Sequence, residues 1–192
     1  LEEIGRNFSL LHAEDRTLGE IAKALRGEEG RWVEINMEDL SLHILDIVEN
    51  SLAASASRVE IVINEDTEKD LLSLEIRDNG TGMDPETKRK ALDPFFTTKK
   101  ARRVGLGLPL LAQAARDSEG EFEIQSEPGK GTVVKATFKL SHPDRKPLGD
   151  IVSTLETLLT TNPELELRFE YRKNSEIVAE LDTRSTDEGA KR

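Results

Sequence analysis

The feature that most constrains the fold of this chain is an apolar strand pattern that ends in an acid and is followed by glycines. Every second residue lies on one face of a strand, and here that face carries Leu72, Leu74, Ile76 and Asp78. An acidic side chain on a core face needs hydrogen-bond donors. Either a ligand supplies them, or the protein does and Asp78 is a structural turn residue. The strand pattern by itself leaves both interpretations open.

Length, charge and composition limit the size of the core and the kinds of partner and site that this chain can have. A chain of 192 residues can bury one core of ordinary size and carry a small appendage. The net charge of −11 repels polyanions, so neither a general nucleic-acid partner nor an acidic membrane is expected. The absence of cysteine excludes disulfides, thiolate metal sites and cysteine nucleophiles. No apolar run could span a bilayer and residues 1–11 are too polar for a signal peptide, so we expect a cytoplasmic protein.

A strong amphipathic helix is predicted from Asn36 to Ala56, with its aliphatic residues confined to one side. A narrow polar arc lies next to this apolar side of the helix. It consists of His43, Asp46 and Asn50, which are spaced by three and four residues. A ligand could lie there between the helix and a sheet. The alternative is a solvated helix face.

Two hairpins are predicted around this helix. The first joins residues 58–63 to the strand that ends at Asp78, and a short helix follows from Asp84 to about residue 92. The second joins residues 122–126 to residues 132–140 through a Pro-Gly-Lys-Gly turn. Thr132 is in phase with the apolar residues of its strand. Its hydroxyl is therefore expected on the inward face, near enough to share a ligand with Asp78.

Between these hairpins lies a basic segment followed by a glycine-rich helix start. Lys99, Lys100, Arg102 and Arg103 fall within five residues and could meet a polyphosphate, although a solubilising loop would look the same. Gly105 and Gly107 open the next helix, where backbone amides can approach an anion. We expect that helix to end at Gly120.

The two ends of the chain are interpreted as extensions. Residues 1–36 show helical patterns and one short strand pattern, and residues 142–192 show a turn-rich joint, an amphipathic helix starting near Leu148, and a β-hairpin. We therefore predict an N-terminal helical extension at 1–36, a central domain at 37–141, and a C-terminal helix and hairpin extension at 142–192.

The order of these motifs resembles the GHKL ATPases and kinases, which include histidine kinases, anti-sigma-factor kinases, gyrase, Hsp90 chaperones and mismatch-repair ATPases. The resemblance covers about residues 37–140 and rests on the Glu-Asn-Ser-Leu-Ala-Ala, Asp-Asn-Gly-Thr-Gly-Met, Gly-Leu-Gly-Leu and Gly-Lys-Gly-Thr boxes. It implies an α/β two-layer sandwich, the Bergerat fold, with a mixed, mostly antiparallel sheet and helices on one face. It also implies ATP and Mg²⁺ as cofactors.

Residue roles follow from the resemblance, position by position. Asn50 would coordinate Mg²⁺, and Asp78 would accept a hydrogen bond from the adenine amino group, directly or through a water that Thr132 shares. Gly82 and Met83 would let the base approach, and Gly105 and Gly107 would lie under the phosphates. The remaining nucleotide contacts would come from Gly80, Phe96, Thr97, Thr98, Lys99, Arg103, Leu106 and Leu108.

Departures from the family pattern bear on the chemistry. Asp46 stands where the hydrolysing branches carry a glutamate, so hydrolysis is expected to be slow or absent. Ala53 and Arg103 stand where the kinases often have a basic residue and a glycine. Neither a phosphoacceptor helix pair nor a transmitting second domain is recognisable. We therefore expect a kinase or slow ATPase acting on a separate protein partner, with Asp46 as the catalytic residue that serves as base or positions the nucleophile. The alternative is a catalytically silent nucleotide-sensing module, and the oligomeric state stays open.

Overall fold

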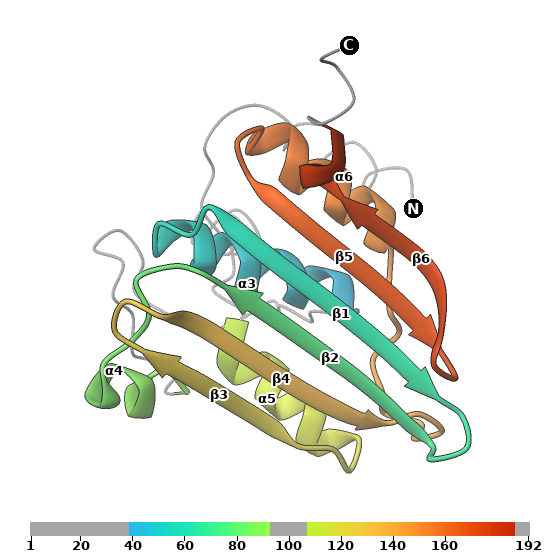
Figure 1. Cartoon of the computed structure of the whole chain (residues 1–192). Helices are drawn as coiled ribbons and strands as arrows, with labels where there is room; N and C mark the ends of the chain where they lie inside the picture. The colour runs from blue at the N-terminus through green and yellow to red at the C-terminus, as the bar shows by residue number, and fades with distance from the viewer. Residues whose placement is uncertain (1–38, 93–106, 187–192) are drawn as a thin grey trace, which may run out of the picture.

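The helices and strands of this protein occur in an order that alternates hairpins with helices (Figure 1). The structure is a computed structural model that describes residues 39–92 and 107–186. The elements are α3 (Leu40–Ala53), β1 (Arg58–Asp66), β2 (Leu71–Asp78), α4 (Pro85–Lys90), α5 (Gly107–Asp117), β3 (Phe122–Glu127), β4 (Gly131–Lys139), α6 (Ile151–Thr161), β5 (Glu166–Lys173), β6 (Glu176–Asp182) and the 3₁₀ helix η2 (Thr183–Thr186).

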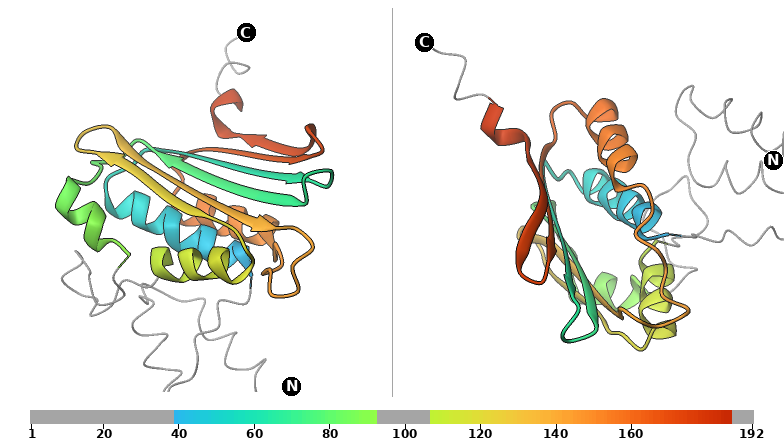
Figure 2. Two further views of the ribbon diagram at one scale, coloured as in Figure 1. Left: turned by 90° about the horizontal axis from the view of Figure 1, so that it is seen from below. Right: turned by 90° about the vertical axis from the view of Figure 1, so that its right-hand side faces the viewer.

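The strands form a six-stranded sheet in the order β3-β4-β2-β1-β5-β6. All neighbours are antiparallel except β1 and β5, which run parallel with Ile61 opposite Phe169. Helices α3, α5 and α6 cover one face (Figure 2). The expected two-layer α/β sandwich with a mixed, mostly antiparallel sheet is thereby confirmed. No helix in the described parts of the chain is long and apolar enough to cross a membrane.

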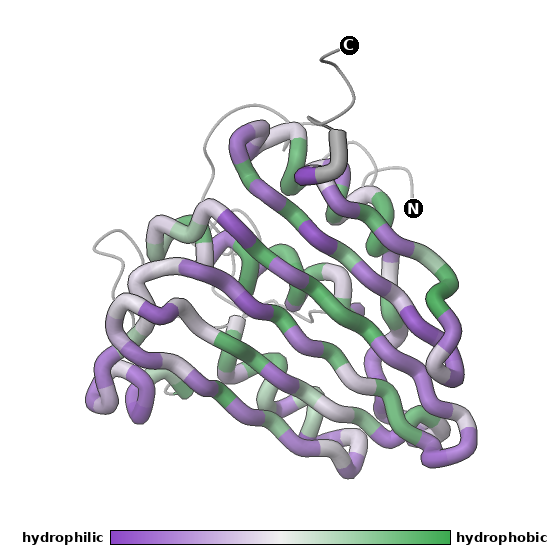
Figure 3. The backbone as a smooth tube through the Cα atoms, in the orientation of Figure 1, coloured by the Kyte–Doolittle hydropathy of each residue, from purple (hydrophilic) through white to green (hydrophobic). Residues whose placement is uncertain are grey.

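The alternation predicted for the strand before the acid is present in β2. Leu72, Leu74 and Ile76 are buried under the helices, whereas Glu75 and Arg77 lie on the open face and form an ion pair of 2.7 Å. Figure 3 shows the same alternation of apolar and polar residues along the neighbouring strands. The period of two therefore placed Asp78 correctly on the helix-covered side of the sheet.

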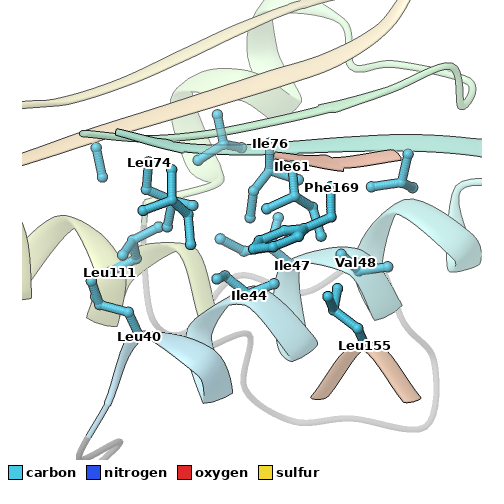
Figure 4. Close-up of a cluster of buried hydrophobic side chains, with 14 of the residues drawn as sticks. Leu40, Ile44, Ile47, Val48, Ile61, Leu74, Ile76, Leu111, Leu155 and Phe169 are labelled. Carbon is cyan, nitrogen blue, oxygen red and sulfur yellow. The ribbon is translucent and has the colours of Figure 1, made fainter. Parts of the chain in front are cut away.

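The core lies between the sheet and the three helices (Figure 4). Helix α3 contributes Ile44, Ile47 and Val48, which are at most 3% exposed. They pack among residues of the strands, α5 and α6 that the same close-up labels, including Ile61, Leu111 and Leu155. Each fully buried aliphatic side chain contributes about 2 kcal/mol to folding. This packing fixes α3 against the sheet and so sets the distance between their polar residues.

The C-terminal segment continues this layered structure. Strand β5 pairs with β1 in the same sheet, and the amides of Leu40 and Ser41 donate to the carbonyls of Pro147 and Leu148, both at 2.9 Å. The helix expected near Leu148 begins only at Ile151. Gly149, at a φ of 74°, breaks the backbone path, and the Asp150 side chain caps the first turn.

The end of α5 also differs from the expectation. The helix ends at Asp117, and the residue with left-handed backbone is Glu119, at a φ of 57°, rather than Gly120. Gly120 is required for another reason, because a Cβ there would lie 1.8 Å from the carbonyl oxygen of Thr137. The glycine thus makes a close contact with β4, and its amide donates to the Ala115 carbonyl at 2.8 Å in the turn that ends α5. The short helix α4 begins as predicted, with the Asp84 carboxylate accepting from the Glu86 and Thr87 amides.

Candidate functional site

The carboxylate of Asp78 lies at the end of β2, half-buried beneath the C-terminal turn of α3. Its Oδ1 accepts from the backbone amides of Gly80, at 2.8 Å, and Thr132, at 3.2 Å. Its Oδ2 accepts from the hydroxyl of Ser51 on α3, at 2.7 Å. Donors from a loop, a strand and a helix therefore converge on a single acid.

These contacts bear on the two interpretations of Asp78. A carboxylate offers about four acceptor positions, and the described residues use three of them. The protein thus orients the carboxylate as a structural aspartate would be oriented, and acceptor capacity remains for a ligand. The structural and the ligand-binding interpretations are compatible at this position.

The glycines after Asp78 allow the loop to pack against two neighbouring segments. A Cβ at Gly80 would lie 2.8 Å from the carbonyl oxygen of Ala54, and the Thr81 amide donates to the same oxygen at 2.9 Å. Gly82 has a φ of 66°, and a Cβ there would lie 2.0 Å from the carbonyl oxygen of Glu127. The loop is therefore held between the end of α3 and the β3–β4 turn.

The β3–β4 turn supplies the opposite wall. Thr132 lies directly opposite Asp78 in the sheet, with Ser126 on its other side, so the three side chains form one row on the helix-covered face. Gly131, at a φ of 80°, approaches so closely that a Cβ would lie 2.0 Å from the Asp78 carbonyl oxygen. The Met83 amide donates to the Ser126 hydroxyl at 2.8 Å. The predicted proximity of Thr132 and Asp78 is present.

The polar arc of α3 is assembled beside this row. Asp46 is 5% exposed, and its Oδ2 accepts from the Asn50 amide nitrogen at 3.2 Å. Gly107, the first residue of α5, faces the same carboxylate, since a Cβ there would lie 1.6 Å from Oδ2. Leu108 follows, half-buried against the core. The start of α5 thus lies against Asp46, and Gly107 leaves room for that carboxylate.

His43 is the third member of the arc, and it is not at a solvated face. It is 1% exposed, and neither ring nitrogen has a hydrogen-bond partner among the residues that the structure describes. Burial, with the positive charge of Lys146 as the second cause, lowers the pKa of His43 to about 4, while Asp39 acts in the opposite direction. The imidazole is therefore neutral at physiological pH.

The structure brings together a subset of the residues that the sequence singled out. Asp46, Asn50, Asp78, Gly80, Gly82, Met83, Gly107 and Thr132 lie on the elements and loops just described, with Leu108 in the first turn of α5. The positions Phe96, Thr97, Thr98, Lys99, Arg103, Gly105 and Leu106 lie outside the described residues, as does the extension at 1–36.

Two site residues were missed by the sequence reasoning. Ser51 binds Asp78, and Ser126 contacts Met83, Gly131 and Thr132. A signal for Ser51 exists in the sequence, because it lies four residues after Ile47 on the apolar side of α3, where a hydroxyl needs a partner. Ser126 is likewise in phase with Phe122 and Ile124.

Comparison with known proteins bears on the family and the fold of this chain. The family model for histidine kinase-, DNA gyrase B-, and HSP90-like ATPases matches residues 35–142, more than half of the chain. Among solved structures, the N-terminal domain of a DNA repair protein superposes with a TM-score of 0.54 at 16% identity, covering 74% of this chain and 52% of that one. At this level of identity, the superposition supports the fold alone.

Three of the curated relatives are bacterial kinases. Sensor protein kinase FleS of Pseudomonas aeruginosa is 37% identical over 97 residues, which are 50% of this chain and 24% of FleS. The histidine-protein kinase AtoS of Escherichia coli is 36% identical over 115 residues, covering 58% and 18%. Sporulation kinase C of Bacillus subtilis is 27% identical over 120 residues, covering 62% and 28%.

The chain thus spans less than a third of the length of each of these relatives. The segment that the family model matches implies nucleotide binding. The protein belongs to the family of histidine kinase-, DNA gyrase B- and HSP90-like ATPases, and contains an ATP-binding domain of the histidine kinase type.

Proposed function

We propose that this chain binds ATP with Mg²⁺ between α3 and the end of β2, and acts as a kinase or slow ATPase on a separate protein partner. The observation that carries the proposal is the bond between the Ser51 hydroxyl and the Asp78 carboxylate. It joins the acid proposed to recognise adenine to the residue directly after Asn50. Base recognition and metal binding would then be fixed to one another through a single turn of α3.

The donor chemistry at Asn50 suits Mg²⁺. An ionised carboxylate only accepts hydrogen bonds, so the contact with Asp46 is made by the amide nitrogen of Asn50. This fixes the amide orientation, with its oxygen on the other side of the group. A single amide oxygen is a hard ligand of the kind Mg²⁺ takes from proteins, with phosphate oxygens and waters completing its shell. Bound there, the ion would neutralise charge on the phosphates.

Asp46 is the candidate for handling the proton of the nucleophile. In phosphoryl transfer the bond between the γ-phosphorus and the bridging oxygen breaks, a bond to the nucleophile forms, and the nucleophile loses its proton. The Asp46 carboxylate would accept that proton or orient the nucleophile, while ADP leaves. The names of the bacterial kinases among the relatives support transfer to a protein, and the acceptor itself belongs to the proposal.

One experiment separates binding from turnover. ADP release with Mg²⁺ and nucleotide affinity by calorimetry are measured for the wild type, Asp46→Asn and Asp78→Asn, three chains of nearly equal side-chain volume. We expect Asp46→Asn to bind ATP but to lose turnover, and Asp78→Asn to lose adenine-dependent affinity with the fold intact. Unchanged ATP affinity in folded Asp78→Asn would contradict the adenine assignment.

A second candidate function is favoured by the burial of Asp46. The residue is 5% exposed, and its carboxylate contacts Asn50 and faces Gly107, so a nucleophile would have limited access to it. In this alternative the chain is a catalytically silent nucleotide sensor, and ATP changes how the terminal extensions hold a partner. ATP binding without turnover in the presence of the partner, together with a partner affinity that depends on ATP, would favour the sensor.

A further inference from the structure

The hydroxyl of Ser126 makes contacts with three groups around the candidate adenine site. Its Oγ lies 2.8 Å from the Met83 amide nitrogen, 3.0 Å from the Gly131 carbonyl oxygen and 2.9 Å from Thr132 Oγ1. Thr132 in turn lies directly opposite Asp78 across the sheet. Ser126 is therefore next to the site without being next to Asp78.

The protons of these groups can be counted. A serine hydroxyl donates one hydrogen bond and accepts two. The Met83 amide can only donate and the Gly131 carbonyl can only accept, so they take one acceptor position and the single proton of Ser126. All three contacts are satisfied only if Thr132 donates its own hydroxyl proton to Ser126. The Thr132 oxygen then presents lone pairs alone to the site.

This arrangement determines what kind of group the site accepts. Thr132 and Asp78 are neighbours in one row, and both offer acceptors without a donor. An exocyclic amino group, or a water that donates to both, suits such a pair. A carbonyl oxygen in the same place would meet two sets of lone pairs, and a site built in this way excludes the wrong base by leaving polar groups unpaired.

We propose that Ser126 is a positioning residue that enforces adenine over guanine by holding the Thr132 hydroxyl proton away from the nucleotide. The inference deepens the proposed function and rests on it. Without the Ser126 oxygen, the Thr132 hydroxyl is released to rotate and donate to the carbonyl of guanine. The discrimination between the two bases then weakens, even though neither Asp78 nor Thr132 has changed.

The test measures the ratio of the ADP and GDP dissociation constants by calorimetry on the full chain. Ser126→Ala is expected to reduce the preference for ADP about tenfold, mainly by gaining GDP affinity. The reason is that the Thr132 oxygen repels the guanine carbonyl in the wild type, whereas the released Thr132 hydroxyl can donate a hydrogen bond to it in the variant. Ser126→Thr keeps the hydroxyl and should restore the wild-type ratio. In a Thr132→Val background, Ser126→Ala should leave the ratio unchanged, because there is no hydroxyl left to release.

A merely structural role for Ser126 would weaken ADP and GDP equally, and an unchanged ratio in folded Ser126→Ala would overturn the inference alone. If Ser126→Ala does not fold, Ser126→Cys tests the same point, since a thiol is a weak acceptor of similar position. A wild-type chain that binds no ADP would overturn the proposed function, and the inference with it. The two failures are therefore distinguishable.

Discussion

The two ends of the sheet form their tight turns by different chemistry. At the site end, Gly82 and Gly131 take left-handed backbone, and in each case a neighbouring carbonyl oxygen occupies the space that a Cβ would need. At the distal end, Asp70 and Glu119 take left-handed backbone too, with φ angles of 54° and 57°, yet they carry side chains.

The side chains of these two left-handed residues make contacts that stabilise their own turns. Asp70 accepts from the Ser141 amide at 2.8 Å and from its hydroxyl at 2.6 Å, and Glu119 pairs with Lys139 at 2.7 Å. At the site end, Gly82 and Gly131 allow backbone segments to come close together because they have no side chains. At Asp70 and Glu119 the distal end has room for side chains, and these side chains make charged contacts.

The largest effect is expected from a methyl group at the site end. Gly131→Ala combines a φ of 80° with a Cβ 2.0 Å from the Asp78 carbonyl oxygen, so the backbone must move. We expect the free energy of unfolding, measured by urea unfolding, to fall by about 4 kcal/mol. We also expect ADP binding, measured by calorimetry, to be lost.

The matched control is two residues away. Gly129→Ala has a similar φ of 77° but nothing within 4 Å of its Cβ, so it should cost only about 1 kcal/mol and leave ADP binding intact. Equal losses in the two variants would mean that backbone conformation, rather than close approach, explains the glycines.

An intermediate loss of stability is expected at low pH. It arises from His43, towards the end of α3 away from Ser51. His43 has a folded pKa of about 4 against 6.5 when unfolded, so the unfolded chain binds the extra proton first as the pH falls. Stability is therefore complete above about pH 6.5 and falls towards pH 4. The loss should be about 2 kcal/mol between about pH 7.5 and about pH 5, measured by urea unfolding.

Two variants of this region sharpen the measurement. His43→Leu should remove most of the acid-dependent loss, since no buried imidazole remains to be protonated. Lys146→Met should shrink the loss, because the charge of Lys146 is the second cause that lowers the pKa of His43. An acid-dependent loss that persists in full in His43→Leu would assign it to other groups.

The smallest effect is expected at the distal end. Asp70→Gly removes the two bonds to Ser141 but also relieves the left-handed strain, so the two changes partly cancel. We expect Tm to fall by about 3 °C, with the ADP affinity unchanged. A marked fall in ADP affinity would show that the two ends of the sheet are coupled, and would break the distinction drawn between them.

Local patterns sufficed for much of the fold. The period of two in β2 placed Asp78 on the correct face, and Thr132 was correctly expected inward, because both statements depend only on neighbours in the sequence. The boxes shared with known ATPases then identified the family. The roles given to individual residues stay predictions until ligand binding is measured.

Contacts between distant segments could not be read in the same way. Ser51 and Asp78 are 27 residues apart, and the pairing of Arg58 with Glu166 spans 108 residues. Helical periodicity placed His43 beside the apolar side of α3, but Lys146, whose charge helps to lower its pKa, lies 103 residues further along the chain. The helix expected near Leu148 begins at Ile151, after Gly149 with its left-handed backbone and the Asp150 cap. Gly149 also lies close to Asp39, a contact that no local pattern contains.

The parallel pairing of β1 with β5 has a consequence for folding during synthesis on the ribosome. Until residue 173 has been made, β1, with the buried residues Val59, Ile61 and Ile63, is the last strand of a growing sheet. One row of its backbone N–H and C=O groups then has no strand beside it, a condition that favours association between nascent chains. A chain cut after residue 142, where the family match ends, would keep that open edge permanently, so expression trials of the minimal ATPase segment are expected to yield aggregates.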